Sequence, residues 1–234
     1  MKKLAIITAR GGSKRIPRKN IKSFCGKPII GYSIEAAIES KCFDTIMCST
    51  DDEEIAEIAK SFGAEIPFFR TPETANDFAT TADVLTEVIR EYGKRDMEFD
   101  YFCCIYPTAP FVNPLKIREG FHKMLDSNAN GAMPVVEFSY PIQRALIIGD
   151  GRLSMLQPEY LRIRSQDLIK TYHDAGQYYW YRTSAFLEQP NIMMLSPVAI
   201  ITPEEEVQDI DTLHDWEMAE QKYRIYVKKK RTKK

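Results

Sequence analysis

The chain has 234 residues, of which 44% are hydrophobic and 28% charged, with a formal net charge of −1. This composition is typical of a globular protein with a buried core, and a nearly neutral chain has no overall attraction to nucleic acid. No apolar run approaches the roughly 20 residues of a membrane span, and Met1-Lys2-Lys3 leads into a short strand rather than a signal-peptide core. We therefore expect a cytoplasmic protein with no nucleic-acid partner and no membrane partner.

The five cysteines are odd in number and form no CxxC pair, and Cys48, Cys103 and Cys104 lie in apolar, strand-like runs. This pattern predicts reduced thiols in the core rather than disulfides or a metal cluster.

Up to about residue 126, short apolar runs alternate with amphipathic stretches. Strands are predicted at 4–8, 44–49, 65–69 and 101–106, and helices at 30–40, 52–62, 80–92 and 114–126. Asp51 is expected to cap the second helix, and Asn113 followed by Pro114 to begin the fourth. The alternation predicts an α/β fold with a mostly parallel sheet and flanking helices.

Beyond residue 130 the pattern becomes irregular, with strand-like runs at 133–138, 177–181 and 198–202 and a last helix at 212–226. We predict a single domain over 1–227, with a small subdomain or oligomer arm at approximately 138–170. The basic run 228–234 is predicted to be a disordered tail rather than a binding element, because blocks of like charge repel and stay solvated.

The stretch from 9 to 20, directly after the first strand, contains two adjacent glycines and five Arg or Lys side chains. Glycines let backbone N–H groups turn toward an anion, and the carboxyl end of a strand is where open α/β sheets bind ligands. A solvated basic turn is the alternative. The loop matches neither GxxxxGK[ST] nor GxGxxG, which argues against an ordinary kinase, GTPase or nicotinamide-dependent enzyme.

Asp209 and Asp211 precede the last predicted helix, and in an extended segment they point to the same side. Carboxylate pairs hold Mg²⁺ together with substrate phosphates. The alternative is that Asp211 only caps the helix while Asp209 is a surface residue. The basic loop favours a metal site, for Mg²⁺ or for Mn²⁺.

The two prolines of 106–110 fix a loop that can shape a substrate pocket. The segments 162–167 and 172–177 combine arginines, amides and the neighbours His173 and Asp174. Because Arg binds carboxylates bidentately, they suit a polyhydroxylated ligand with a carboxylate. No GxSxG elbow accompanies His173, so a hydrolase triad is not expected.

Together these stretches resemble the cytidylyltransferases that activate nine-carbon α-keto acid sugars, the CMP-sialic acid synthetase group. The likeness extends from residue 4 to about residue 223. The matching positions are Ala9-Arg10, Ser13-Lys14 and Lys19-Asn20, then 70–73 with Asp77 and Thr81, then 106–110, and finally Asp209-Ile210-Asp211.

Within the group, Arg15-Ile16 and the stretches 164–168, 172–176 and 206–212 are similar to the branch that acts on pseudaminic acid. Tyr106, Val112 and 173–176 stand where sialate enzymes have other residues. The resemblance thus implies pseudaminic acid as the sugar. Legionaminic or N-acetylneuraminic acid is the alternative, and a non-catalytic CTP-binding sensor is a more distant one.

The resemblance implies a Rossmann-like nucleotide-diphospho-sugar transferase fold with a dimerisation arm that crosses to a neighbour's site. It implies transfer of CMP from CTP to the anomeric hydroxyl of a nonulosonic acid, with release of pyrophosphate, by a homodimer.

The resemblance also assigns the site residues. The catalytic set is Arg10, Lys19 and Asp211, and the metal ligands are Asp209 and Asp211. The nucleotide set is Ala9, Arg10, Gly11, Gly12, Ser13, Lys14, Lys19, Asn20, Arg70, Asp77 and Thr81. The sugar set is Tyr106, Thr108, Arg164, Gln166, Tyr172, His173, Asp174 and Gln177.

Overall fold

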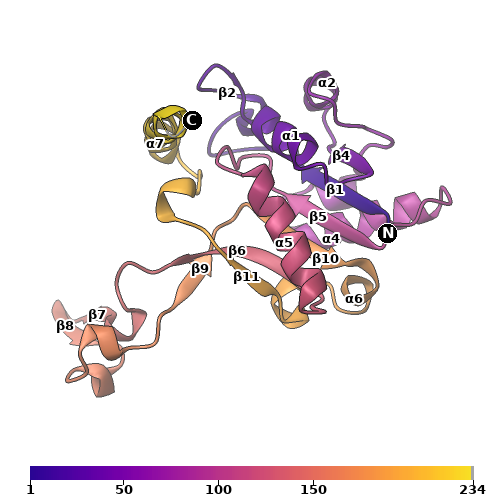
Figure 1. Cartoon of the computed structure of the whole chain (residues 1–234). Coiled ribbons are helices and arrows are strands. Elements are labelled where there is room, and N and C mark those ends of the chain that lie inside the picture. Colours follow the sequence, from indigo (N-terminus) through magenta and orange to yellow (C-terminus); the bar gives the residue numbers. More distant parts are fainter. Residues whose placement is uncertain (233–234) are drawn as a thin grey trace.

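A computed structural model of the chain describes residues 1–232 and contains one central sheet with the strand order β11-β6-β10-β5-β1-β4, and β9 also pairs with β6 (Figure 1). Its strands are β1 (Lys3–Thr8), β4 (Thr45–Ser49), β5 (Tyr101–Ile105), β6 (Gly131–Glu137), β9 (Tyr172–Asp174), β10 (Tyr178–Arg182) and β11 (Val198–Ile201). Two small hairpins lie outside it, β2 (Ser23–Phe24) with β3 (Lys27–Pro28), and β7 (Leu146–Gly149) with β8 (Arg152–Met155).

The helices are α1 (Ile29–Ser40), α2 (Glu53–Ser61), α3 (Pro72–Ala75), α4 (Thr81–Gly93), α5 (Pro114–Asp126), α6 (Thr183–Glu188) and α7 (Leu213–Thr232). β1 pairs in parallel with β4 and β5, and β11 pairs in parallel with β6. β10 is antiparallel to both of its neighbours. The predicted α/β fold with a mostly parallel sheet is confirmed.

In the centre of the sheet both faces are buried, as the alternation within β1 shows. Ala5 and Ile7 lie in a core cluster with residues of α1 and α5, while Leu4 and Ile6 lie in a second cluster with residues of α4 and α6. Successive side chains of a strand point to opposite faces, so a strand with apolar residues at every position must be covered on both.

A third cluster joins the two ends of the described chain. Ile16 and Phe24, from the segment after β1, pack with Ile210 and with Trp216 of α7. The ring of Phe24 meets the rings of Trp216 and Tyr223 edge to face, with centroids 5.5 Å apart in both pairs. α7 therefore covers the segment that follows the basic loop.

Two local predictions were wrong. Residues 65–69 form no strand, but only an isolated bridge between Met47 and Glu65, because Pro67, within the segment, has no N–H to donate to a ladder. The cap of α2 is Asp52, which accepts a hydrogen bond from the Ile55 N–H, and not Asp51. The expected cap at Asn113 with Pro114 is confirmed.

The C-terminal basic run was predicted to be a disordered tail, but over the residues that the structure describes it belongs to a helix. α7 continues to Thr232, so residues 228–232 form its last turns. Lys233 and Lys234 lie outside the described residues.

The segment between β6 and β9 projects away from the sheet as an arm with the β7–β8 hairpin at its end (Figure 1). It also contains the short 3-10 helices η2 (Ile142–Arg144), η3 (Pro158–Tyr160) and η4 (Ser165–Asp167). The exposed aliphatic residues of this arm are Ile142, Leu146, Ile147, Ile148, Leu153, Leu156, Leu161, Ile163 and Ile169. The hairpin therefore has no hydrophobic core of its own within one chain.

The cysteines match their prediction, since all five are free thiols and only Cys25 is not buried. Within residues 1–232, no helix combines the length and apolarity needed to cross a membrane.

Candidate functional site

A cavity of about 420 Å³ lies at the carboxyl ends of β1 and β5, where the sheet was expected to bind its ligand. It brings together the basic loop, the α3–α4 connection and the loop after β5. Its lining residues are Thr8, Arg10, Ser13, Lys14, Arg15, Lys19, Asn20, Asp77, Tyr106, Pro107 and Thr108. The cavity thus contains eight of the residues assigned from the sequence.

Hydrogen bonds from neighbouring strands and helices fix the path of the basic loop. The Ala9 N–H donates to the Ser49 carbonyl at 2.9 Å, and the Gly11 N–H donates to Asp51 Oδ1 at 2.9 Å. The side-chain amide of Asn20 donates to the Arg10 carbonyl at 2.9 Å, and Asn20 is only 7% exposed. Asp51, predicted as a helix cap, instead holds the glycine turn, while Gly12 beside it is exposed.

At one side of the cavity, two loop cations meet one carboxylate. Arg10 Nη1 lies 2.9 Å from Asp77 Oδ1 and also donates to the Asn76 carbonyl at 3.0 Å. Lys14 also pairs with Asp77, and its hydrogen bond and charge hold the pKa of that carboxyl below its usual value, with Arg10 adding to the effect. Asp77 therefore neutralises part of the charge that would face a polyanion.

At the other side, two more loop cations meet Asp211. Lys19 Nζ donates to the Ile210 carbonyl at 2.6 Å and lies 3.6 Å from Asp211 Oδ1. Arg15 Nη1 lies 2.9 Å from Asp211 Oδ2. The segment before α7 thus lies against the basic loop, although Lys19 and Ile210 are 191 positions apart in the sequence.

The carboxylate pair fits a hard cation in part. Ile210 is buried at 1% exposure, so the flanking side chains of Asp209 and Asp211 turn away from the core. In residues 1–232 no cluster of three or more His, Cys, Asp or Glu side chains could hold a metal ion. A Mg²⁺ ion here would need ligands from water and phosphate oxygens, as Mg²⁺ sites with nucleotides use. The donor set fits a metal that arrives with a polyanion.

At the inner end of the cavity, hydroxyl groups connect Tyr106 to the strand that carries Asp174. Tyr106 hydrogen-bonds to Thr81 and Tyr179, and its ring meets that of Tyr179 with centroids 5.3 Å apart. The Tyr179 hydroxyl donates to Asp174 Oδ2 at 2.6 Å. Asp174 Oδ1 accepts the Gly176 N–H at 2.8 Å, which fixes the carboxylate.

Sequence reasoning missed Tyr179 and Arg15 as site residues. Tyr179 belongs to a run of four aromatic residues in a buried strand, and only the hydrogen bond to Asp174 distinguishes it from its neighbours. Arg15 lies in the basic loop, and its contact with Asp211 cannot be derived from spacing.

Other assigned residues lie apart from the cavity lining. Arg70 is 8% exposed and bonds the Ser49 carbonyl and hydroxyl, so it supports the end of β4. The Gln177 amide donates to the Glu206 carbonyl at 2.6 Å. Arg164 pairs with Asp167 at 2.8 Å on the exposed arm. Three more lie outside the lining: Gln166 on the arm, and Tyr172 and His173 on β9.

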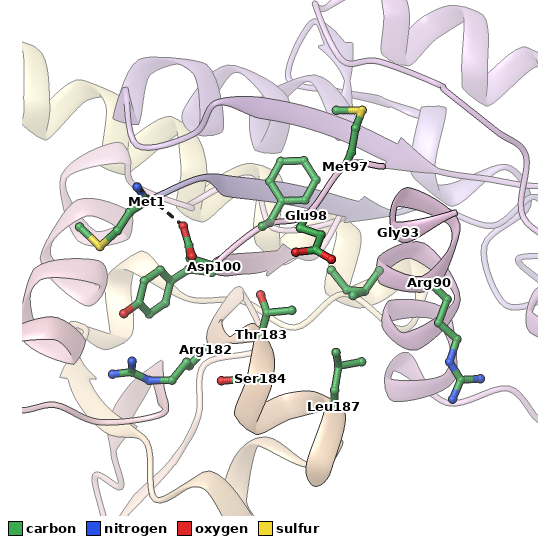
Figure 2. A pocket seen from close by; sticks show the side chains of 13 residues that line it. Met1, Arg90, Gly93, Met97, Glu98, Asp100, Arg182, Thr183, Ser184 and Leu187 are labelled. Carbon is green, nitrogen blue, oxygen red and sulfur yellow. Dashed lines mark ion pairs between the residues drawn. The ribbon is translucent and has the colours of Figure 1, made fainter. Parts of the chain in front are cut away.

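A larger cavity of about 570 Å³ lies at the opposite ends of β1 and β5 (Figure 2). The side chains of Phe99, Thr183 and Leu187 line it, and an ion pair joins Asp100 to the amino group of Met1. None of the motif residues contributes to its lining. Volume alone therefore does not locate the site in this molecule.

The chain matches known proteins over almost its whole length. The family model described as cytidylyltransferase matches residues 4–231. The chain belongs to the cytidylyltransferase family. It is 41% identical over 226 residues to the pseudaminic acid cytidylyltransferase of Campylobacter jejuni, covering 96% of this chain and 97% of that protein. The family resemblance inferred from the motifs is thereby confirmed.

Two further relatives broaden the comparison. This cytidylyltransferase is 35% identical over 137 residues to the CMP-N,N'-diacetyllegionaminic acid synthase of Legionella pneumophila, which is 58% of this chain and 59% of that one. A solved structure of CMP:2-keto-3-deoxy-manno-octonic acid synthetase complexed with CTP superposes with a TM-score of 0.69 at 20% identity, covering 94% of this chain and 98% of that one. That likeness confirms the nucleotidyltransferase fold.

Proposed function

We propose that this cytidylyltransferase transfers CMP from CTP to the anomeric hydroxyl of pseudaminic acid and releases pyrophosphate. The observation that carries the proposal is the 41% identity, over nearly the whole of both chains, to a protein named for that activity. The cavity supports it, because it offers four cations from one loop to a triphosphate.

In this reaction the anomeric oxygen attacks the α-phosphorus of CTP, the bond from that phosphorus to the β-phosphate oxygen breaks, and pyrophosphate leaves. The proton of the hydroxyl passes to solvent or to a neighbouring base. Because the protein forms no covalent bond, its contribution is to position the reactants and to balance the charge on the phosphates.

We assign Arg10, Lys14 and Lys19 to the phosphates, because all three line the cavity as cations. Asn20 holds the loop, and Thr81 lies beside Tyr106 at its inner end. Asp211, with Asp209, is proposed to bind Mg²⁺ or Mn²⁺, which supplies charge neutralisation when bound.

We assign the sugar to the end of the cavity formed by Tyr106 and Thr108, with Tyr179 and Asp174 behind them. His173 lies next to this group on β9 and its ring meets that of Phe138. Polar groups fixed in this way discriminate between sugars, because the wrong isomer leaves them without partners.

We further propose a homodimer in the cytoplasm, in which the arm packs against a second copy. The exposed aliphatic side chains of the arm support this, since a two-stranded hairpin is marginally stable alone. Arg164 and Gln166 lie on this arm, away from the cavity of their own chain. They are proposed to reach the sugar of the neighbouring site.

The test is an assay of pyrophosphate release with CTP, ATP, GTP and UTP, each with pseudaminic, N,N'-diacetyllegionaminic and N-acetylneuraminic acid. We expect turnover with CTP and pseudaminic acid, loss of activity in EDTA, and recovery with Mg²⁺ or Mn²⁺. A preference for legionaminic acid would favour the second candidate, which the partial Legionella match supports. CTP binding without turnover of any sugar would indicate a non-catalytic sensor.

A further inference from the structure

Arg15 lies directly against a carboxylate that the proposed function assigns to a metal. Its Nη1 is 2.9 Å from Asp211 Oδ2, while Lys19 Nζ is 3.6 Å from Oδ1, so each oxygen of the carboxylate faces a cation. The side chain of Asp211 is 42% exposed and that of Arg15 is 67% exposed. Solvent therefore reaches the pair, and Arg15 is free to move away.

A divalent cation that approaches Asp211 in this arrangement meets two positive charges first. At the few ångströms that separate them, repulsion between like charges is worth about 1 kcal/mol even in a largely aqueous environment. Without nucleotide, metal binding therefore requires that the ion pair between Arg15 and Asp211 break, which leaves Arg15 without a partner.

A triphosphate changes this balance, because Arg15 and Lys19 both line the cavity in which Arg10 and Lys14 also lie. The phosphates offer these cations a stronger partner than one carboxylate, and Arg is well suited to phosphate oxygens. When the cations turn to the phosphates, both oxygens of Asp211 are released.

We propose that Arg15 is a positioning residue that blocks Asp211 until the nucleotide is present, so that metal binding depends on nucleotide binding. The inference rests on the proposed metal role of Asp211. By linkage, the metal and the nucleotide then raise each other's affinity by the same factor.

The same loop offers a matched control. Arg18 is also a partly exposed arginine, but it pairs with Asp52 and Glu54 at the start of α2 and does not line the cavity. Arg18→Ala thus removes an equal charge without releasing Asp211.

The experiment titrates the full-length protein with Mn²⁺ and follows free Mn²⁺ by electron paramagnetic resonance, first without nucleotide. We expect Arg15→Ala to bind Mn²⁺ roughly 3–10-fold more tightly than wild type, the scale set by one solvent-exposed charge pair. Arg18→Ala should match wild type. Adding Asp211→Asn to Arg15→Ala should abolish the gain.

The second measurement repeats the titration with saturating CTP and no sugar. CTP should raise the Mn²⁺ affinity of wild type more than that of Arg15→Ala, because the variant has no block to remove. Equal thermal unfolding midpoints for the variants would establish that folding is unchanged.

Two negative results have different meanings. If Arg15→Ala binds Mn²⁺ no better than wild type without CTP, while Asp211→Asn weakens binding with CTP, the role of Arg15 is refuted and the metal site stands. If Asp211→Asn has no effect on Mn²⁺ binding with CTP, the metal assignment itself fails.

Discussion

At the level of single residues, the hydroxyl groups behind the cavity form a chain that ends at Asp174. An ionised Asp174 can only accept, so the Tyr179 hydroxyl donates to it, as observed. Tyr106 hydrogen-bonds with both Tyr179 and Thr81. Burial and these contacts raise the pKa of Tyr179 far above that of a free tyrosine, so the chain stays protonated.

Tyr179→Phe removes the middle of this chain, so Asp174 Oδ2 and the Tyr106 hydroxyl each lose one hydrogen bond. We expect kcat/KM for the sugar to fall about 10-fold, the value of one such hydrogen bond, while the Kd for CTP is unchanged. Steady-state kinetics and calorimetry measure the two effects. Tyr181→Phe in the same strand, whose ring stacks on Phe102, is the control. A loss of CTP affinity in Tyr179→Phe would place this residue at the nucleotide instead.

At the level of elements, the start of α2 anchors the basic loop. Asp52 caps the helix through the Ile55 N–H and also forms two hydrogen bonds with Arg18. The bond from Arg18 is the main cause that holds the pKa of Asp52 below its usual value of 3.8. A depressed carboxyl pKa stabilises the fold above the unfolded-state pKa, and this stabilisation is lost as the pH falls through the folded-state pKa.

Asp52→Asn keeps a good capping residue but removes the ion pair with Arg18. We expect a loss of about 1 kcal/mol or less at neutral pH, because the pair is partly exposed. Urea unfolding at a series of pH values should show the difference from wild type shrinking as the pH falls through the folded-state pKa of Asp52. A constant difference at all pH values would mean that packing, not charge, is responsible.

The sequence predicted elements where one local signal decides the outcome. Apolar residues at four successive positions of β1 required cover on both faces, and Asn113 before Pro114 marked a helix start. Where two signals competed, prediction failed: Asp51 and Asp52 can both cap, and the loop takes Asp51.

For the candidate site, the sequence motifs predicted which residues of the loops lie together, but not the contacts between distant segments. Arg10, Lys19 and Tyr106 do line one cavity. The contact of Arg15 with Asp211 depends on how α7 packs, and Lys19 and Ile210 are 191 positions apart in the chain. No local pattern encodes such a distance, so these contacts could be found only in the structure.

At the level of the whole molecule, the arm carries apolar residues that this chain does not cover. Ile148 is 77% exposed and Leu153 is 68% exposed, and they are cross-strand partners in the β7–β8 hairpin. Ile148→Asp should therefore convert the proposed dimer to a monomer. Sedimentation velocity measures the change, and Lys116→Asp, remote from the arm, is the control.

If each arm completes the site of the neighbouring chain, two inactive variants with damage in different parts of the site should restore activity when they are mixed. Lys19→Ala damages the phosphate end of a site, and Arg164→Ala damages the arm that the neighbour receives. After refolding as an equimolar mixture, mixed dimers contain one site with neither change, so activity should return to about a quarter of the wild-type level. If mixing restores no activity, each chain completes its own site and the arm has another role.

The aromatic cluster that joins Ile16 and Phe24 to Trp216 also has a consequence for biosynthesis. Closing so large a loop of chain is entropically costly, so contacts of this kind form late in folding. Lys19 leaves the ribosome 191 residues before Ile210, whose carbonyl it binds. The nascent chain therefore carries the basic loop, over that length of synthesis, without the segment that packs against it.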